Sequence, residues 1–234
     1  MNQQKLRVKA LLIDLDGTLV DSTEAYVTAV KSGFATIGLD RFDVKTAREI
    51  AKRSELKLPL NDLFTEIHAD QNMIERFLDT YLNAYYAATL TKTKPLPNVH
   101  KTLQTLSKRF PLALITLRFI SKERVTEELR HLGFNKYFKA VVTALDVKKP
   151  KPYPDALLMG AERLGIPVDE CAIIGDSIVD VHAGKSAGAR TVAVLSGLFS
   201  KKELEKEKPD LILENINWLP KFLVIKNDEK PKED

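Results

Sequence analysis

Short apolar runs alternate with amphipathic stretches over much of this chain. The first run, residues 10–13, has the basic Lys9 before it and a carboxylate-glycine turn after it, which favours a buried β-strand over a helix. Further strands are predicted at residues 112–116, 140–143, 171–175 and 191–195, with a short edge strand at 211–213. Amphipathic helices are predicted between them at residues 99–108, 122–132, 154–164 and 179–187.

A different pattern fills the chain between the first two strands. Ser22 is a plausible N-cap, and apolar residues then recur at helical spacing until Gly38. Helical patterns continue at residues 44–53, 60–68 and 72–90, with no strand-like run among them. Two prolines in residues 91–98 then end the helical block, so this segment reads as a linker.

Alternating strands and helices predict an α/β fold, a doubly wound parallel sheet with helices on both sides. The helical block is inserted into this core. We expect a core domain of residues 1–20 and 93–225 and an all-helical domain of residues 21–92. Trp218, Leu219 and Phe222 suggest a closing helix, and the charged tail 226–234 is expected to be solvated.

Composition narrows the class of protein. The 234 residues carry 36 Lys and Arg against 32 Asp and Glu, a net charge of +4 with the signs interspersed, which argues against nucleic acid as a partner. No apolar segment approaches the length of a membrane span, so no membrane partner is expected. The single cysteine, Cys171, excludes an internal disulfide and fits the cytoplasm. We expect a monomer or a homodimer.

Two aspartates follow the first strand. Asp14 and Asp16 lie on the same side of an extended chain, so their carboxylates leave the sheet together. Asp and Gly are common turn residues, and the pair also fits a plain turn. If the carboxylates are buried, however, their repulsion and desolvation call for a cation.

Other polar residues end later strands or flank them. Thr116 ends the second strand, and Asp176 follows Gly175 with Asp180 four residues on. Lys151 precedes a proline in the segment before the next helix. Taken singly, the threonine fits a helix cap, the lysine a solvated turn, and the aspartates an N-cap and a first-turn acid. In an open parallel sheet, however, the carboxyl ends of the strands form the site.

This order of motifs resembles the haloacid dehalogenase superfamily of phosphohydrolases. The resemblance covers residues 9–195, and its motifs are Asp14-x-Asp16-Gly17-Thr18, Thr116, Lys151-Pro152-x-Pro154 and Gly175-Asp176-Ser177-x-x-Asp180. It implies a Rossmann-like core and identifies the inserted helices as a cap. The branch it most resembles is that of phosphoglycolate phosphatase and β-phosphoglucomutase.

The resemblance also implies roles for individual residues. Asp14 is expected to be the nucleophile and Asp16 the general acid and base. Mg²⁺ is expected on Asp14, the Asp16 backbone carbonyl and Asp176, with Asp180 in support. The residues expected to hold the phosphoryl group are Asp14, Gly17, Thr116, Leu117 and Lys151.

One departure concerns the second motif, where family members commonly have Asn after the hydroxyl residue. Here Leu117 and Arg118 follow, and Arg118 reads either as a contact to an anionic substrate group or as a surface arginine. Within the expected cap, candidate substrate contacts are Arg48, Lys52, Arg53, His68 and Tyr85.

The function expected from these residues is a Mg²⁺-dependent phosphatase of a small phosphorylated metabolite, acting through an aspartyl-phosphate. A phosphomutase is the nearest alternative, because the same residues return the phosphoryl group to sugar instead of water. A haloacid dehalogenase needs neither a leaving-group acid nor a metal, so Asp16 and Asp176 argue against it. A phospho-receiver module has its acidic residues and its nucleophile in a different order along the chain. A non-catalytic binding protein is disfavoured because every position at which the family has a catalytic residue carries the expected residue type here.

Overall fold

The computed structural model describes residues 5–39, 43–61, 63–64 and 70–226, and the chain forms two compact units. One unit combines Met1–Leu19 with Pro95–Asp234, and the other is Val20–Lys94. Two short strands, β3 (Val20–Asp21) and β4 (Lys94–Pro95), pair where the chain passes from one unit to the other. Among the described residues, no helix is both long and apolar enough to cross a membrane.

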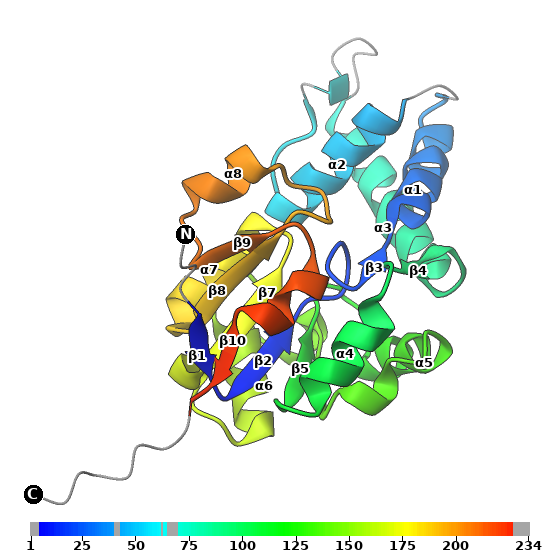
Figure 1. The fold of residues 1–234 in the computed structure, drawn as a ribbon. Helices are drawn as coiled ribbons and strands as arrows, with labels where there is room; N and C mark the ends of the chain where they lie inside the picture. Colours follow the sequence, from blue (N-terminus) through cyan, green and yellow to red (C-terminus); the bar gives the residue numbers. More distant parts are fainter. Residues whose placement is uncertain (1–4, 40–42, 62, 65–69, 227–234) are drawn as a thin grey trace, which may run out of the picture. The chain divides into compact units, whose positions relative to one another are not determined.

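The first unit contains a six-stranded sheet of order β6-β5-β2-β7-β8-β9 in which every pairing is parallel. The strand β2 (Ala10–Ile13) lies between β5 (Leu112–Ile115) and β7 (Cys171–Gly175), as Figure 1 shows. All four residues of β2 are buried, as expected for a strand covered on both faces. The carboxyl end of β2 therefore lies at the middle of one sheet edge.

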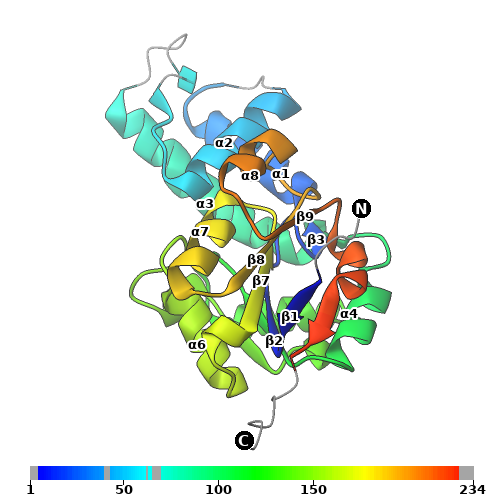
Figure 2. The ribbon, with the colours of Figure 1, turned by 60° about the vertical axis from the view of Figure 1, so that its left-hand side comes forward.

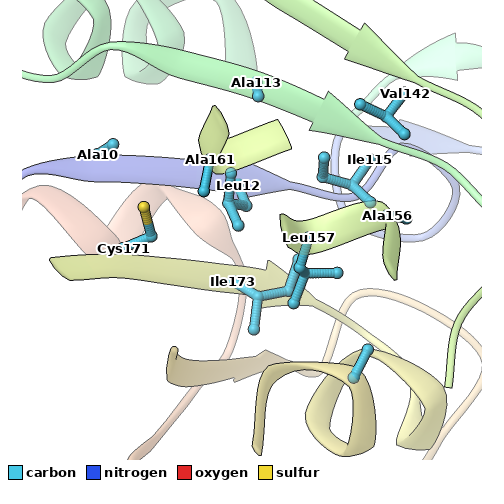
Figure 3. Packing of buried hydrophobic residues seen from close by; sticks show 11 residues of the cluster. Ala10, Leu12, Ala113, Ile115, Val142, Ala156, Leu157, Ala161, Cys171 and Ile173 are labelled. Carbon is cyan, nitrogen blue, oxygen red and sulfur yellow. The ribbon is translucent and has the colours of Figure 1, made fainter. Parts of the chain in front are cut away.

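Helices cover both faces of this sheet (Figure 2). The helices α6 (Asp155–Leu164) and α7 (Ile178–Ala187) pack side by side on one face, and α4 (Val99–Ser107) lies on the other. Between the sheet and α6 is a core of small and branched side chains, shown in Figure 3. It contains Leu12, Ile115 and Ile173 from the strands and Leu157 from α6, all buried. The doubly wound α/β fold expected from the sequence is thus confirmed.

The remaining elements complete the same unit. They are α5 (Lys122–His131), β6 (Ala140–Val142), β8 (Arg190–Val194), α8 (Lys201–Lys206), β9 (Leu211–Leu213) and the 3₁₀ helices η2 (Asn135–Tyr137), η3 (Ala144–Asp146), η4 (Val168–Glu170) and η5 (Ile216–Lys221). The closing helix expected around Trp218 is a 3₁₀ helix. A pair of short parallel strands, β1 (Leu6–Val8) and β10 (Leu223–Ile225), was not anticipated.

The second unit contains α1 (Thr23–Thr36), α2 (Val44–Leu56) and α3 (Gln71–Lys92). An aspartate side chain caps each of the last two helices, Asp43 accepting from Thr46 N–H and Asp70 from Met73 N–H. Phe34, Phe64 and Phe77 form an aromatic cluster with ring centroids 5.1–5.7 Å apart. Most of the helix expected at 60–68, and the expected tail beyond residue 226, lie outside the described residues.

Candidate active site

The site begins at the end of β2, where the chain leaves the sheet. The backbone N–H of Asp14 donates to the carbonyl of Ile174 at 2.9 Å, which continues the pairing with β7 by one residue. The Asp14 side chain is buried at the carboxyl edge of the sheet. Gly17 then adopts φ +76°, a conformation that glycine accepts without strain, and the chain turns back toward β3.

Lys151 joins two of the aspartates. Its buried ammonium lies 2.7 Å from Asp14 Oδ1 and 2.6 Å from Asp180 Oδ1, and it also donates to the carbonyl of Ile115 at 3.2 Å. The side chains of Lys151 and Asp180 are 2% and 3% exposed, so both charges are removed from water. A buried ion pair of this kind needs its hydrogen bonds satisfied, and these three contacts satisfy the three ammonium protons. Lys151 therefore connects the ends of β2 and β5 to α7.

Asp180 serves both the helix and the site. Its Oδ2 accepts from Ser177 N–H at 3.3 Å, and the Ser177 side chain accepts from Val179 N–H, which forms a capping box at the start of α7. Its other oxygen contacts Lys151. Asp180 therefore has both roles considered from the sequence: it is the acid in the first turn of α7, and it belongs to the candidate site.

Two hydrogen bonds and two close glycines fix the position of the Asp176 carboxylate. The carboxylate accepts from Leu198 N–H at 3.0 Å and from the Thr18 hydroxyl at 3.4 Å. The backbone of Gly197 passes so close that a Cβ there would lie 1.7 Å from Asp176 Oδ2. A Cβ on Gly17 would lie 2.5 Å from the same oxygen. Glycine at these two positions leaves the space that the carboxylate occupies.

Asp14, Asp176 and Asp180 form one buried acidic cluster. One carboxylate oxygen from each can be chosen so that all three lie within 4.8 Å of one another. Against these three carboxylates the cluster contains the single ammonium of Lys151, which leaves a formal charge of −2 when all are ionised. The cluster is thus consistent with metal binding, and its all-oxygen donor set suits a hard divalent cation.

Burial has the largest effect on the pKa of Asp14, the expected nucleophile. It raises the pKa of Asp14 to about 8, and the nearby Asp180 and Asp16 carboxylates add to the rise against the attraction of Lys151. Burial alone would lower the pKa of Lys151, but the Asp14 and Asp180 carboxylates raise it above its usual value. Lys151 therefore stays protonated at neutral pH, while Asp14 needs further positive charge to ionise fully.

The expected phosphate-binding residues flank this cluster. Thr116 follows β5 directly and is buried, its N–H donating to Val142 O at 2.9 Å. The carbonyl of Gly17 accepts from the Ser196 hydroxyl at 2.7 Å, which holds the turn after β2. Leu117 is half-buried on the same loop as Thr116.

Arg118 is buried and paired, so of the two readings that the sequence left open, that of a surface arginine was wrong. Its Nε and Nη2 donate to Oδ2 and Oδ1 of Asp16, both at 2.7 Å, and its Nη1 donates to Glu128 on α5. The arginine side chain is only 2% exposed. Three of its N–H groups, one on each of Nε, Nη1 and Nη2, are thus bonded to carboxylates of this chain.

Two of the candidates in the helical unit, Arg53 and Tyr85, have local partners. Arg53 donates to Glu49 at 2.8 Å and to the carbonyl of Pro59 at 3.0 Å, and Tyr85 stacks with Tyr81. Arg48 and Lys52 lie on the same helix as Arg53, while His68 lies outside the described residues.

Several contributors escaped the sequence analysis: Ser196 at the Gly17 turn, Gly197 and Leu198 beside Asp176, and Glu128 beside Arg118. One sequence signal existed for Glu128, which lies in register with the buried Val125 and Leu129 on the apolar face of α5. A carboxylate at such a position calls for a buried cation. The loop residues 196–198 carry no comparable pattern.

Comparison with known proteins places this site in a family. Residues 11–194 match the family described as haloacid dehalogenase-like hydrolase, and the chain belongs to that family. The phosphoglycolate phosphatase of Escherichia coli K12 is 30% identical over 246 residues, covering 95% of each chain. The pyrophosphatase PpaX of Bacillus velezensis is 30% identical over 221 residues, covering 91% of this chain and 95% of its own.

Among solved structures, a haloacid dehalogenase-like hydrolase from Streptococcus pneumoniae has the same fold. Its TM-score is 0.76 at 22% identity, over 92% of this chain and 98% of that one. The family expected from the sequence motifs is confirmed, and with it the class of enzyme, a hydrolase of the haloacid dehalogenase type with phosphatases among its relatives.

Proposed function

We propose that this protein is a Mg²⁺-dependent phosphatase that hydrolyses a small phosphorylated metabolite through an aspartyl-phosphate on Asp14. The observation that carries the proposal is the convergence of Asp14, Asp176 and Asp180, with one oxygen of each within 4.8 Å of the others, while the Lys151 ammonium contacts Asp14 and Asp180. An anionic ester that approaches an anionic nucleophile needs compensating positive charge. The Lys151 ammonium and a cation held by the acidic cluster would supply that charge.

The proposed metal ligands are those that the family resemblance implies, and the buried acidic cluster supports them. Asp14, the Asp16 backbone carbonyl and Asp176 would hold Mg²⁺, with Asp180 in support. Two positive charges would balance the formal −2 of the cluster and favour ionised Asp14. When bound, the ion offsets the charge of the phosphoryl oxygens during transfer.

The reaction is proposed in two steps on the side chains of this chain. A carboxylate oxygen of Asp14 attacks phosphorus, the bond from phosphorus to the ester oxygen breaks, and Asp16 donates a proton to the departing oxygen. Water then attacks the phosphoryl group, Asp16 takes a proton from that water, and Asp14 is regenerated. Lys151, Thr116 and the backbone at Gly17 and Leu117 hold the phosphoryl oxygens.

The substrate class follows from the chemistry and from the relatives' names. A phosphatase of phosphoglycolate and a pyrophosphatase are both similar to this chain over nearly its whole length. We propose a small phosphomonoester, with the helical unit Val20–Lys94 acting as a cap that selects it. A cytoplasmic enzyme, monomer or homodimer, remains the prediction.

The test is phosphate release from a panel of phosphoglycolate, pyrophosphate, hexose 1-phosphates and p-nitrophenyl phosphate. Turnover should require Mg²⁺ and stop in EDTA. Asp14→Asn should lower kcat at least about 10³-fold, while Asp169→Asn, an exposed control, should not. Isomerisation of a hexose 1-phosphate without phosphate release would favour the phosphomutase. Undiminished turnover by Asp14→Asn would refute the nucleophile assignment.

A further inference from the structure

We propose that Arg118, anchored by Glu128, is a positioning residue that fixes the orientation of the Asp16 carboxylate for proton transfer. This inference rests on the proposed function, since it assumes that Asp16 is the general acid and base.

The contact to Asp16 is bidentate. The Nε and Nη2 atoms of Arg118 each donate to a different oxygen of Asp16 at 2.7 Å. Two parallel bonds between a planar guanidinium and a planar carboxylate hold the two groups in a common plane, so the carboxylate cannot rotate freely. Because the Asp16 side chain is 27% exposed, it would otherwise be open to water and to other rotamers. The pair therefore gives a partly exposed carboxylate a single orientation.

Glu128 explains why the arginine stays in place. The side chains of Arg118 and Glu128 are 2% and 3% exposed, and a buried guanidinium without an anionic partner is costly. Glu128 comes from the buried face of α5, ten residues along the chain from Arg118, and accepts from Nη1. This contact leaves the Nε and Nη2 edge of the guanidinium directed at Asp16.

The backbone of Arg118 is fixed as well. Its N–H donates to the Thr116 hydroxyl at 3.3 Å, and its carbonyl accepts from Ala144 N–H at 3.1 Å. The same short loop thus carries the proposed phosphate-binding hydroxyl and the residue that orients Asp16. The consequence is that the side chain orienting the proposed proton donor and the proposed phosphate-binding hydroxyl lie two residues apart on the turn after β5.

A purely structural ion pair would make a different prediction from a positioning residue. Loss of packing or stability lowers the activity toward all substrates alike. A misplaced general acid instead slows the esters whose leaving oxygen needs a proton, and slows little those whose leaving group is a stable anion. Leaving-group dependence therefore separates the two roles.

The experiment measures kcat/KM for two substrates, p-nitrophenyl phosphate and the best alkyl phosphate of the panel above. The variants are Arg118→Lys, Arg118→Met and Glu128→Gln, with the exposed Arg130→Lys and Glu127→Gln of α5 as matched controls. We expect Arg118→Met to lose about 100-fold on the alkyl ester and no more than about threefold on the aryl ester. Arg118→Lys and Glu128→Gln should also affect the alkyl ester more than the aryl ester, with a loss of about tenfold in kcat/KM on the alkyl ester.

Equal losses on both esters, or a rise in KM alone, would overturn the inference. Thermal unfolding reports whether each variant folds, and Glu128→Gln preserves size and a hydrogen-bond acceptor if Arg118→Met does not fold. Combined with Asp16→Asn, Arg118→Lys should cost no more than about twofold further on the alkyl ester, because it acts through Asp16. If Asp16→Asn itself shows no leaving-group selectivity, the proposed acid role has failed. If only the Arg118 and Glu128 variants lack selectivity, this inference alone has failed.

Discussion

Replacing Asp14 by asparagine is expected to stabilise the metal-free protein while it abolishes turnover. Burial raises the pKa of Asp14 to about 8, well above the 3.8 that an aspartate has in an unfolded chain. Between these two values the folded protein binds a proton that the unfolded chain releases, so stability falls as pH rises. Asparagine does not titrate and still offers an oxygen to Lys151. The stability of Asp14→Asn should therefore not fall with pH for this reason.

The magnitude follows from the same two pKa values. Between these two pKa values, each rise of one pH unit lowers the free energy of unfolding of the wild type by about 1.4 kcal/mol. The loss is therefore close to zero near pH 4 and about 4 kcal/mol at pH 7. Above about pH 8 it no longer grows. At pH 7 we expect the free energy of unfolding of Asp14→Asn to exceed that of the wild type by about 2–4 kcal/mol. The lower end of this range allows for water entry and relaxation around the buried carboxylate, which reduce the loss in the wild type.

The assay is urea unfolding in EDTA across this pH range. Trp218, the only tryptophan in the sequence, lies in η5 of the same unit as Asp14, so its fluorescence reports the unfolding of that unit. Asp169→Asn on η4 removes an exposed carboxylate and serves as the control. Added Mg²⁺ should raise the stability of the wild type and not that of Asp14→Asn, since a bound cation stabilises only the form that holds it.

Two results would refute this reasoning. If Asp14→Asn were no more stable than the wild type at pH 7 in EDTA, ionisation of Asp14 would not destabilise the folded protein as this reasoning requires. If its advantage were the same at pH 4 and pH 7, the gain would come from packing and not from ionisation.

Two further predictions concern packing, one beside the site and one in the core. Gly197→Ala places a Cβ 1.7 Å from Asp176 Oδ2, so it should displace this carboxylate and weaken Mg²⁺ binding at least about tenfold, measured as the loss of the Mg²⁺-induced rise in Tm. Gly188→Ala, at the far end of α7 where a Cβ meets nothing within 4 Å, should keep that rise although its φ of +79° costs stability. Burial raises the pKa of the Cys171 thiol to about 12, so iodoacetamide at pH 8 should modify the folded protein at least about 100-fold more slowly than the unfolded chain. Equal rates would contradict the burial of this residue.

The core of the fold was predictable because its strands are covered on both faces. Strands such as β2 and β7 read as unbroken apolar runs, and alternation with amphipathic helices then implies a parallel sheet. The pair β1 and β10 was missed because each strand has three residues, too few to show a period. Their pairing joins the two ends of the described chain and depends on the completed fold.

The acidic cluster was predictable in outline from the position of each motif at the end of a strand. The contacts around Asp16 were not, because Arg118 lies 102 residues away and in a loop, where no period applies. The glycine at 197 also gave no signal, since its importance lies in a close approach to Asp176 that only the folded chain creates.

The measurement that tests the central claim most directly is detection of the covalent intermediate. The enzyme with Mg²⁺ and a turned-over substrate is quenched in acid, digested, and examined by mass spectrometry. With p-nitrophenyl phosphate, whose leaving group needs no acid, we predict a phosphoryl group on Asp14. It should be more abundant in Asp16→Asn, because that variant lacks the base for hydrolysis, and absent from Asp14→Asn. Active wild-type enzyme with the phosphoryl group on another residue, or steady turnover by Asp14→Asn, would contradict the account.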